Sequence, residues 1–126
     1  MKQAITIALA MAAGAIFGAA AVNGLHAQGK PGAYAVVDIS EINDLDTFKT
    51  LLPKAGPAMN AFGGQFVART EKITAVQGTP PKRFVIIAFD SFDKAKAWSE
   101  SPAQKEVDAI RDKSTKSREF IVDGAL

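Results

Sequence analysis

The stretch Arg83–Asp90 (RFVIIAFD) decides the fold, because it predicts a β-strand that is apolar on both faces. Successive side chains of a strand point to opposite faces of its sheet. One face carries Val85, Ile87 and Phe89, and the other carries Phe84, Ile86 and Ala88. Such a strand has to be covered on both sides. The fold built around it must therefore supply two covering layers.

Three further strands are predicted over 33–40, 65–70 and 117–122, where β-branched or alternating residues recur. Apolar residues at helical spacing predict one helical region over 45–62 and another that follows Ser91. The resulting order, β-α-β-β-α-β, is that of an α+β ferredoxin-like sandwich with an antiparallel sheet and helices on one face. Because nothing else in the chain covers the second face, we expect a homodimer that packs sheet against sheet.

Each helical region is predicted to consist of two pieces. Pro53 and Pro57 interrupt the first, since an interior proline removes a backbone donor. Gly63 then suits the left-handed end of that helix. In the second region, the pair Ser101-Pro102 is typical of a new helix start, and Lys116 is expected near the end of that helix.

Residues 1–27 have the order of a secretory signal: Lys2, an uncharged run over 4–22, and the small residue Ala27 at the expected cleavage point. An uncleaved inner-membrane anchor through 4–22 is the alternative, because 19 residues approach the roughly 20 that span a bilayer. Residues 28–32 (QGKPG) are read as a linker and 33–126 as the folded domain. The expected location is periplasmic or secreted, with membrane contact only if the leader is retained.

Cleavage after Ala27 would remove the one histidine, His26, from a chain that has no cysteine. The domain would then have no imidazole or thiol, which excludes a Ser-His-Asp triad, a Cys nucleophile and His-ligated metals. No metal spacing, phosphate loop or glycine fingerprint is present, so no metal and no cofactor is expected. With 14 basic and 13 acidic residues, the domain gives no electrostatic reason to bind nucleic acid.

Five residues are candidates for a ligand site. Asp38, on a mostly apolar strand, is an acid/base group, a carboxylate paired with Arg69 or Arg83, or one exposed at the end of the strand. The two arginines suit a carboxylate or enolate ligand, or an ion pair with Asp38, Asp90 or Glu71. Trp98 would cap a small apolar pocket between helix and sheet, or pack in the core. Tyr34 would donate its hydroxyl to a ligand, or only begin its strand.

The cations near the C-terminus are expected to be solvated, or to meet anionic lipid if the chain is anchored. They are Arg111, Lys113, Lys116 and Arg118.

An ordered series of motifs resembles domain-of-unknown-function family 1330, small proteins of the dimeric α+β barrel superfamily. The series comprises Ala33-Tyr34, Phe62-Gly63-Gly64 with Arg69, Gly78-x-x-Pro81-x-Arg83, Phe89-Asp90-Ser91 with Ala95 and Trp98, Ser101-Pro102, Ile110-Arg111, and Arg118 with Gly124. The resemblance implies the ferredoxin-like fold and dimerisation. It implies no single reaction, because the superfamily includes cofactor-free monooxygenases, haem-handling enzymes, isomerases and binding modules.

The sequence departs from the family pattern at three places. Gln65 stands where the family often has Arg or Lys after the glycine pair, and Gln104 stands where it often has Tyr. The first helix opens with 44–48 (DLDTF), where the family usually has Asp-Pro-Glu-x-Tyr. These changes remove cationic and polar aromatic groups, so the ligand of a relative does not carry over to this chain.

Three functions remain open from the sequence. The first is an exported homodimer that binds a small apolar or acidic molecule without catalysis. The second is a cofactor-free isomerase or monooxygenase, with Asp38 as the base and Arg69 or Arg83 holding an oxyanion. The third is a membrane-tethered structural partner protein without a pocket.

Overall fold

The computed structural model describes residues 32–124. The predicted leader, 1–27, and all of the predicted linker except Gly32 lie outside these residues. Among the described residues, no helix is both long and apolar enough to cross a membrane.

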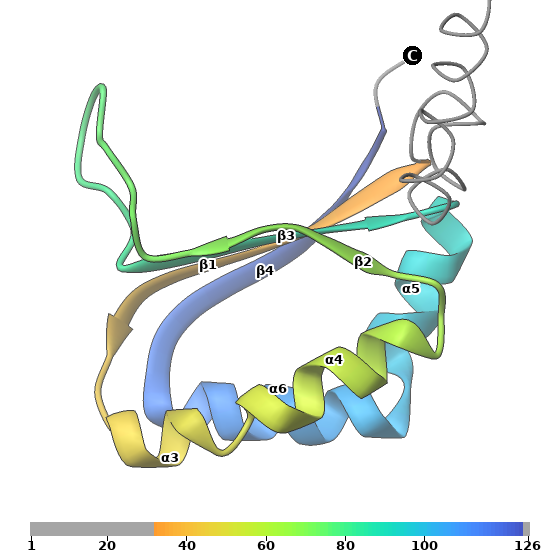
Figure 1. Cartoon of the computed structure of the whole chain (residues 1–126), viewed down its shortest axis with the longest axis horizontal. Coiled ribbons are helices and arrows are strands. Elements are labelled where there is room, and N and C mark those ends of the chain that lie inside the picture. Colours follow the sequence, from red (N-terminus) through yellow and green to blue (C-terminus); the bar gives the residue numbers. More distant parts are fainter. Residues whose placement is uncertain (1–31, 125–126) are drawn as a thin grey trace, which may run out of the picture. The chain divides into compact units, whose positions relative to one another are not determined.

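The described chain forms four strands and four helices in the predicted order (Figure 1). In sequence they are β1 (Ala33–Ile42), α3 (Leu45–Lys49), α4 (Leu52–Asn60), β2 (Gln65–Thr70), β3 (Arg83–Phe89), α5 (Phe92–Glu100), α6 (Pro102–Ser114) and β4 (Thr115–Asp123). The strands form one antiparallel sheet in the order β2-β3-β1-β4. All four helices lie on one face of it (Figure 1). The α+β ferredoxin-like prediction is thus confirmed.

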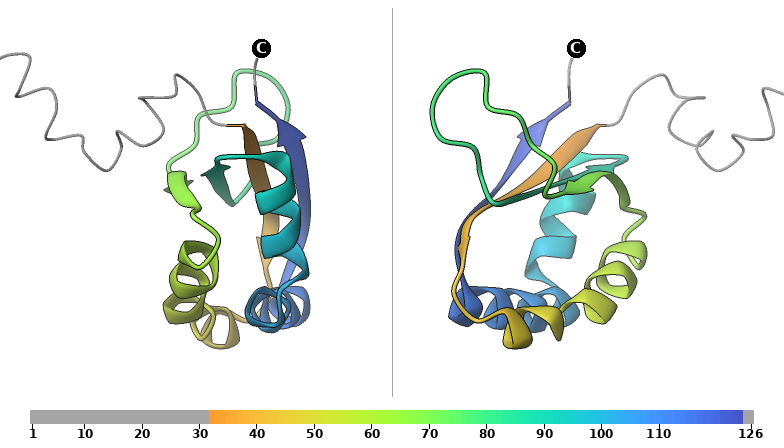
Figure 2. Two further views of the ribbon diagram at one scale, coloured as in Figure 1. Left: turned by 90° about the vertical axis from the view of Figure 1, so that its right-hand side faces the viewer. Right: turned by 60° about the vertical axis from the view of Figure 1, so that its left-hand side comes forward.

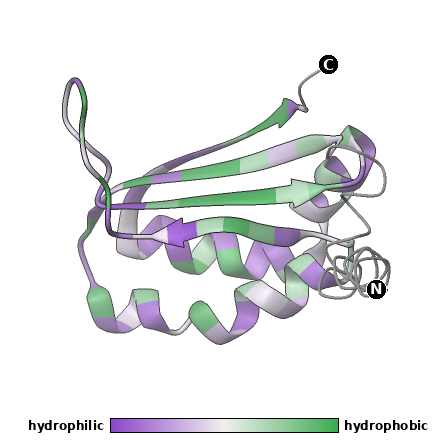
Figure 3. Cartoon of the chain, turned by 45° about the horizontal axis from the view of Figure 1, so that its top comes forward, coloured by the Kyte–Doolittle hydropathy of each residue, from purple (hydrophilic) through white to green (hydrophobic). Residues whose placement is uncertain are grey.

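The apolar strand β3 lies inside the sheet beside β1, and the two carry most of the apolar character of the sheet (Figure 3). On the helix side, alternate residues of both strands are buried in the core with Phe48, Met59, Trp98 and Val107. The strand residues of this core are Ala33, Ala35, Val37, Ile39, Val85, Ile87 and Phe89. Burying these side chains supplies the main driving force for folding.

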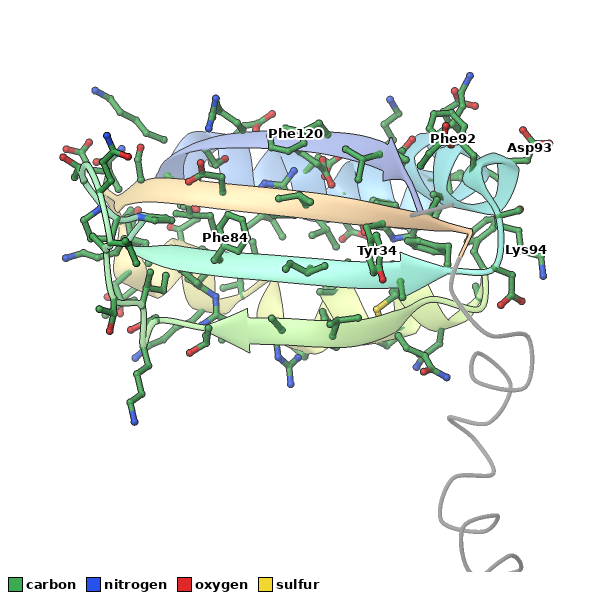
Figure 4. The ribbon with its side chains drawn as sticks, turned by 90° about the horizontal axis from the view of Figure 1, so that it is seen from above. Tyr34, Phe84, Phe92, Asp93, Lys94 and Phe120 are labelled. Atoms are coloured by element: carbon green, nitrogen blue, oxygen red, sulfur yellow. The ribbon has the colours of Figure 1, made fainter. Side chains whose placement is uncertain are left out.

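The opposite face of the sheet carries no helix, and we call it the open face. Strand pairing places one apolar row across it, Phe120–Val36–Ile86–Ala68. Figure 4 looks onto this face and shows Tyr34, Phe84 and Phe120 lying on three different strands. Phe120 and Val122 are each 41% exposed. The second covering layer that the sequence requires is therefore absent from the described chain.

Side chains cap three of the helix starts. Asp44, Ser91 and Ser101 each accept a hydrogen bond from the backbone N–H three residues later, at 3.1–3.2 Å. The break in the first region precedes Pro53, which lies in the first turn of α4, where a missing N–H costs nothing. The predicted interruption at Pro57 is wrong, because this residue lies inside α4.

The last strand begins earlier than predicted, at Thr115, so Lys116 belongs to β4 and not to the end of α6. The side chains of Ser114 and Thr115 donate hydrogen bonds to carbonyls of the last turn of α6, which allows the chain to enter β4 directly.

A β-bulge interrupts the pairing of β2 with β3. Phe66 pairs with Ile87, the next pair is Ala68 with Ile86, and Val67 is the extra residue between them. A bulge changes the face on which the following side chains emerge. Phe66 and Arg69 consequently share the helix side of the sheet, although simple alternation would separate them.

The glycine pair after α4 has two different roles. Gly63 has a φ of 76°, the left-handed conformation that glycine adopts without a steric cost. Gly64 is needed for space, since a Cβ there would lie 2.6 Å from Met59 and 2.7 Å from Phe89.

We expect Gly64→Ala to lower the free energy of unfolding by about 1–3 kcal/mol, the usual cost of overpacking a core. Gly56→Ala is the matched control, because the residue is inside α4 and nothing beyond its chain neighbours and the nearby helix backbone lies within 4 Å of the added Cβ. It should raise stability by up to about 1 kcal/mol. Urea denaturation of both variants measures the difference, and equal stabilities would contradict the close packing at Gly64.

Candidate functional site

A cavity of about 60 Å³ lies between the sheet and the helices. Its floor is the helix side of the strands, and its other walls come from all four helices and the residue that precedes α4. The lining residues are Val37, Ile39, Phe66, Arg69, Arg83, Val85 and Ile87 from the sheet, with Phe48, Leu51, Leu52, Ala55, Trp98, Gln104, Val107 and Arg111 above it. The walls are mainly apolar, with polar groups at two places.

The helices lie on two sides of this cavity. Figure 2 shows α4 on the β2 side of the helical layer and α5 and α6 on the side of β1 and β4. The lining residues Leu52 and Arg69 are solvent-exposed, whereas Trp98 and Val107 are almost fully buried. The cavity therefore has its mouth near β2 and α4, and its inner end near α5 and α6.

Two arginines stand at the mouth. The guanidinium carbon of Arg69 lies 4.2 Å from the centre of the Phe66 ring, and that of Arg83 lies 5.8 Å from the Phe48 ring. Neither guanidinium forms a hydrogen bond with another described residue. The nearest carboxylate to Arg83 is that of Glu71, at 3.6 Å, and this carboxylate is largely solvent-exposed. Arg83 thus forms an ion pair with Glu71, one of the partners expected from the sequence. Because neither guanidinium donates a hydrogen bond within the described chain, both cations at the mouth retain donors for an anion.

The inner end of the cavity contains a buried ion network centred on Arg111. One terminal nitrogen of this residue lies 2.8 Å from Asp108 and 2.8 Å from Glu119. Gln104 donates a further hydrogen bond to Asp108 at 3.0 Å. The side chains of Arg111 and Glu119 are only 8% and 21% exposed. This network joins α6 to β4.

Burial raises the pKa of Glu119 above its usual value, although the charge of Arg111 opposes this shift. Desolvation therefore outweighs the ion pair at this carboxylate.

The structure brings three of the five predicted site residues together. Arg69, Arg83 and Trp98 all line the cavity. Tyr34 and Asp38 emerge on the open face, where they pair across strands with Ala88 and Phe84. A single-chain pocket that combines Asp38 with Arg69 or Arg83 is consequently not formed, because the sheet separates these side chains.

Asp38 pairs with a different arginine from those expected. Its carboxylate accepts a hydrogen bond from Arg118 at 2.9 Å, at the end of the open face. This pair lines a wider hollow of about 440 Å³, which the loop between β2 and β3 closes on one side with Thr79, Pro80 and Pro81. Asp38 is therefore an ion-paired carboxylate on the open face, and not the base beside Arg69 or Arg83 that the enzyme hypothesis requires.

Two lining residues carry polar groups that the sequence did not single out as ligand contacts. Gln104 is 3% exposed and Arg111 is 7% exposed. Arg111 was expected among the solvated cations, and this is wrong because Asp108 and Glu119 enclose it. The i, i+3 spacing of Asp108 and Arg111 gave a partial signal. Glu119, which lies on the next strand, meets Arg111 only in the fold.

The described residues contain no group of three or more His, Cys, Asp or Glu side chains that could hold a metal ion.

We expect the free energy of unfolding of Glu119→Gln, relative to that of the original protein, to be higher at pH 7 than at pH 4. The folded state holds the Glu119 proton to a higher pH than the unfolded state does, so stability falls as the pH rises between the two pKa values. Glutamine keeps an oxygen that accepts from Arg111 and has no such titration. Urea unfolding at both pH values measures the effect.

The matched control is Glu106→Gln, whose carboxylate is 60% exposed and pairs with Lys54. It should change stability little at either pH. A Glu119→Gln protein that is destabilised more at pH 7 than at pH 4 would show that the ion pair with Arg111 outweighs desolvation.

Several solved structures share this fold. A protein of unknown function from Rhodopseudomonas palustris, RPA0582, is 13% identical with a TM-score of 0.58, covering 81% of this chain and 89% of that protein. SnoaB, a cofactor-independent oxygenase from Streptomyces nogalater, is 13% identical with a TM-score of 0.51, covering 72% and 90%. A dimeric ferredoxin-like protein of unknown function from Jannaschia is 12% identical with a TM-score of 0.52, covering 72% and 95%.

These identities establish a common fold and not a common activity. No curated protein sequence matches the chain significantly. The family model described as Domain of unknown function (DUF1330) matches residues 32–125, which is most of the chain. The chain therefore belongs to the DUF1330 family.

Proposed function

We propose that this protein is an exported homodimer that binds a small carboxylic acid in the cavity between sheet and helices. The observation that carries the proposal is the pair Arg69 and Arg83, which stand at the mouth of an apolar cavity without a hydrogen-bond acceptor from the described chain. The guanidinium fork matches a carboxylate in shape and charge. The proposed ligand places its acid group there and its apolar body inside.

The size of the cavity limits the ligand. A cavity that holds benzene measures about 150 Å³, so 60 Å³ suits a short aliphatic chain better than a ring. Longer or ring-containing acids would have to displace side chains of α3 and α4. The proposal is therefore a short-chain acid.

Export and dimerisation rest on separate support. The order of charged, apolar and small residues in 1–27 supports export. The open face, with Val36, Ile86 and Phe120 in one row, supports a dimer that packs two sheets together. The dimeric Jannaschia protein shares the fold and so gives a precedent for a dimer of this fold.

A cofactor-free oxygenase or isomerase is the second candidate, favoured by the fold shared with the Streptomyces nogalater oxygenase. In this case Arg69 and Arg83 would hold an oxyanion. Asp38 is unsuitable as its base, since it lies on the other face of the sheet. The cavity itself argues against a structural partner protein without a pocket.

Trp98 is the only tryptophan of the chain and lines the cavity, so its fluorescence reports occupancy directly. We expect pentanoate to change this fluorescence in a saturable manner and 1-pentanol, which has no charge, to bind at least about tenfold more weakly. Titration of the protein purified after expression of the full chain provides the measurement.

Arg83→Gln should weaken pentanoate binding about tenfold or more, because the carboxylate loses its fork-shaped partner. Arg118→Gln is the matched control, since Arg118 lies on the open face and pairs with Asp38. Equal losses in both variants, or no binding of pentanoate by the original protein, would refute the proposed site.

For the dimer, we expect Phe120→Glu to halve the molar mass measured by light scattering, because it places a charge on the proposed interface. Leu45→Glu changes a similarly exposed apolar residue on α3 and should leave the mass unchanged. A monomeric original protein, or a dimer that survives Phe120→Glu, would contradict packing through the open face.

A further inference from the structure

The loop between β2 and β3, residues 71–82, rises from the sheet on the side of the open face (Figures 1 and 3). We call its central part, residues 73–81 (ITAVQGTPP), the arm. The loop is anchored at its end, because the backbone N–H of Lys82 donates to the carbonyl of Ile39 at 2.8 Å. Connections between neighbouring antiparallel strands usually contain about 2–5 residues, so this one is unusually long. Any body that covers the open face at this end must meet the arm.

The composition of the arm is that of an interface. It contains no charged residue, although charged residues make up 22% of the chain and Lys72 and Lys82 stand on either side of it. Depletion of charge is typical of the core of an interface. Val76 is 99% exposed, whereas the next most exposed large apolar side chain of the described residues, Val67, is 58% exposed. The arm therefore presents to water a side chain that gains from being covered.

The subunit itself offers the arm no surface to pack on. Among the described residues, no hydrogen bond involves 73–81, whether from backbone or from side chain. The hollow of about 440 Å³ has Thr79, Pro80 and Pro81 on one side and Asp38 and Arg118 of the sheet on the other. The arm thus stands off its own sheet, and the two prolines restrict its backbone.

The reach of the arm suits a dimer that packs sheet against sheet. Packed sheets lie about 10 Å apart. A loop that runs out and back over 71–82 can rise by as much as roughly 20 Å, at about 3.3 Å per residue. A second sheet placed on the open face would therefore lie beside the arm and not beyond its tip.

We propose that the arm packs its uncharged residues, above all Val76, against the side of the partner subunit's sheet in the homodimer. By two-fold symmetry, each dimer has two such contacts. This inference rests on the proposed function, because it requires a dimer that forms through the open face. It assigns to the loop the role of holding that dimer together.

Val76→Asp should raise the dissociation constant of the dimer about tenfold or more, because a carboxylate would be desolvated at each of two contacts. Val76→Leu keeps an apolar side chain and should leave the constant nearly unchanged. Leu45→Asp is the matched control, since Leu45 is 53% exposed on α3, on the helix side of the sheet. Light scattering over a concentration series measures the constant, and circular dichroism verifies that each variant is folded.

Trypsin provides a second measurement, made on the original protein. It cuts after Lys72 only when the adjoining arm is free to enter its active site. The dimer should be cut there at least about tenfold more slowly than the monomer, which dilution below the dissociation constant or Phe120→Glu supplies. Fragment masses identify the cut. Cleavage after Lys49, at the end of α3, is the internal reference and should not depend on dimerisation.

The inference requires both results, the weakened dimer of Val76→Asp and the protection of Lys72. If Phe120→Glu dissociates the dimer but either of these results is absent, the arm is not held by the partner. This inference is then refuted, while the dimer of the proposed function stands. If the original protein is a monomer, or if its dimer survives Phe120→Glu, the proposed dimer fails and the inference fails with it.

Discussion

The structure depends on the pairing of two strands, β1 and β3, that are apolar on both faces. Their helix-side residues form the floor of the core, and their other residues form the centre of the open face. A sheet of this kind cannot leave either face in water without a cost that grows with the exposed apolar area. The helices meet this requirement on one side, and a second copy of the sheet is the cover that we propose for the other.

The sheet also separates two chemical environments. On the helix side, two arginines lie at the mouth of an apolar cavity, and the ion network of Arg111 with Asp108 and Glu119 lies at its inner end. On the open side, the Asp38–Arg118 pair lies at the end of an apolar surface. Side chains that are neighbours along a strand therefore meet different surroundings, one facing the cavity and the next facing the open side.

Much of this architecture could be predicted from the sequence, because it depends on local rules. The alternation in 83–90 and the capping residues Ser91 and Ser101 predicted their elements correctly. The environments of Asp38 and Arg111 could not be predicted in this way. The partners of Asp38 depend on strand register, and the burial of Arg111 depends on Glu119 reaching it from the next strand.

The bulge at Val67 has a consequence for comparing members of the family. The bulge is the reason that Arg69 faces the cavity although it lies three residues after Phe66, so the pairing of the backbone, and not only the type of side chain, determines whether β2 contributes a cation. In a relative of the same length whose β2 pairs with β3 without a bulge, an arginine at this position would pair with the counterpart of Phe84 and emerge on the open face. Conservation of this arginine is thus informative only where the pairing that turns it to the helix side is conserved as well.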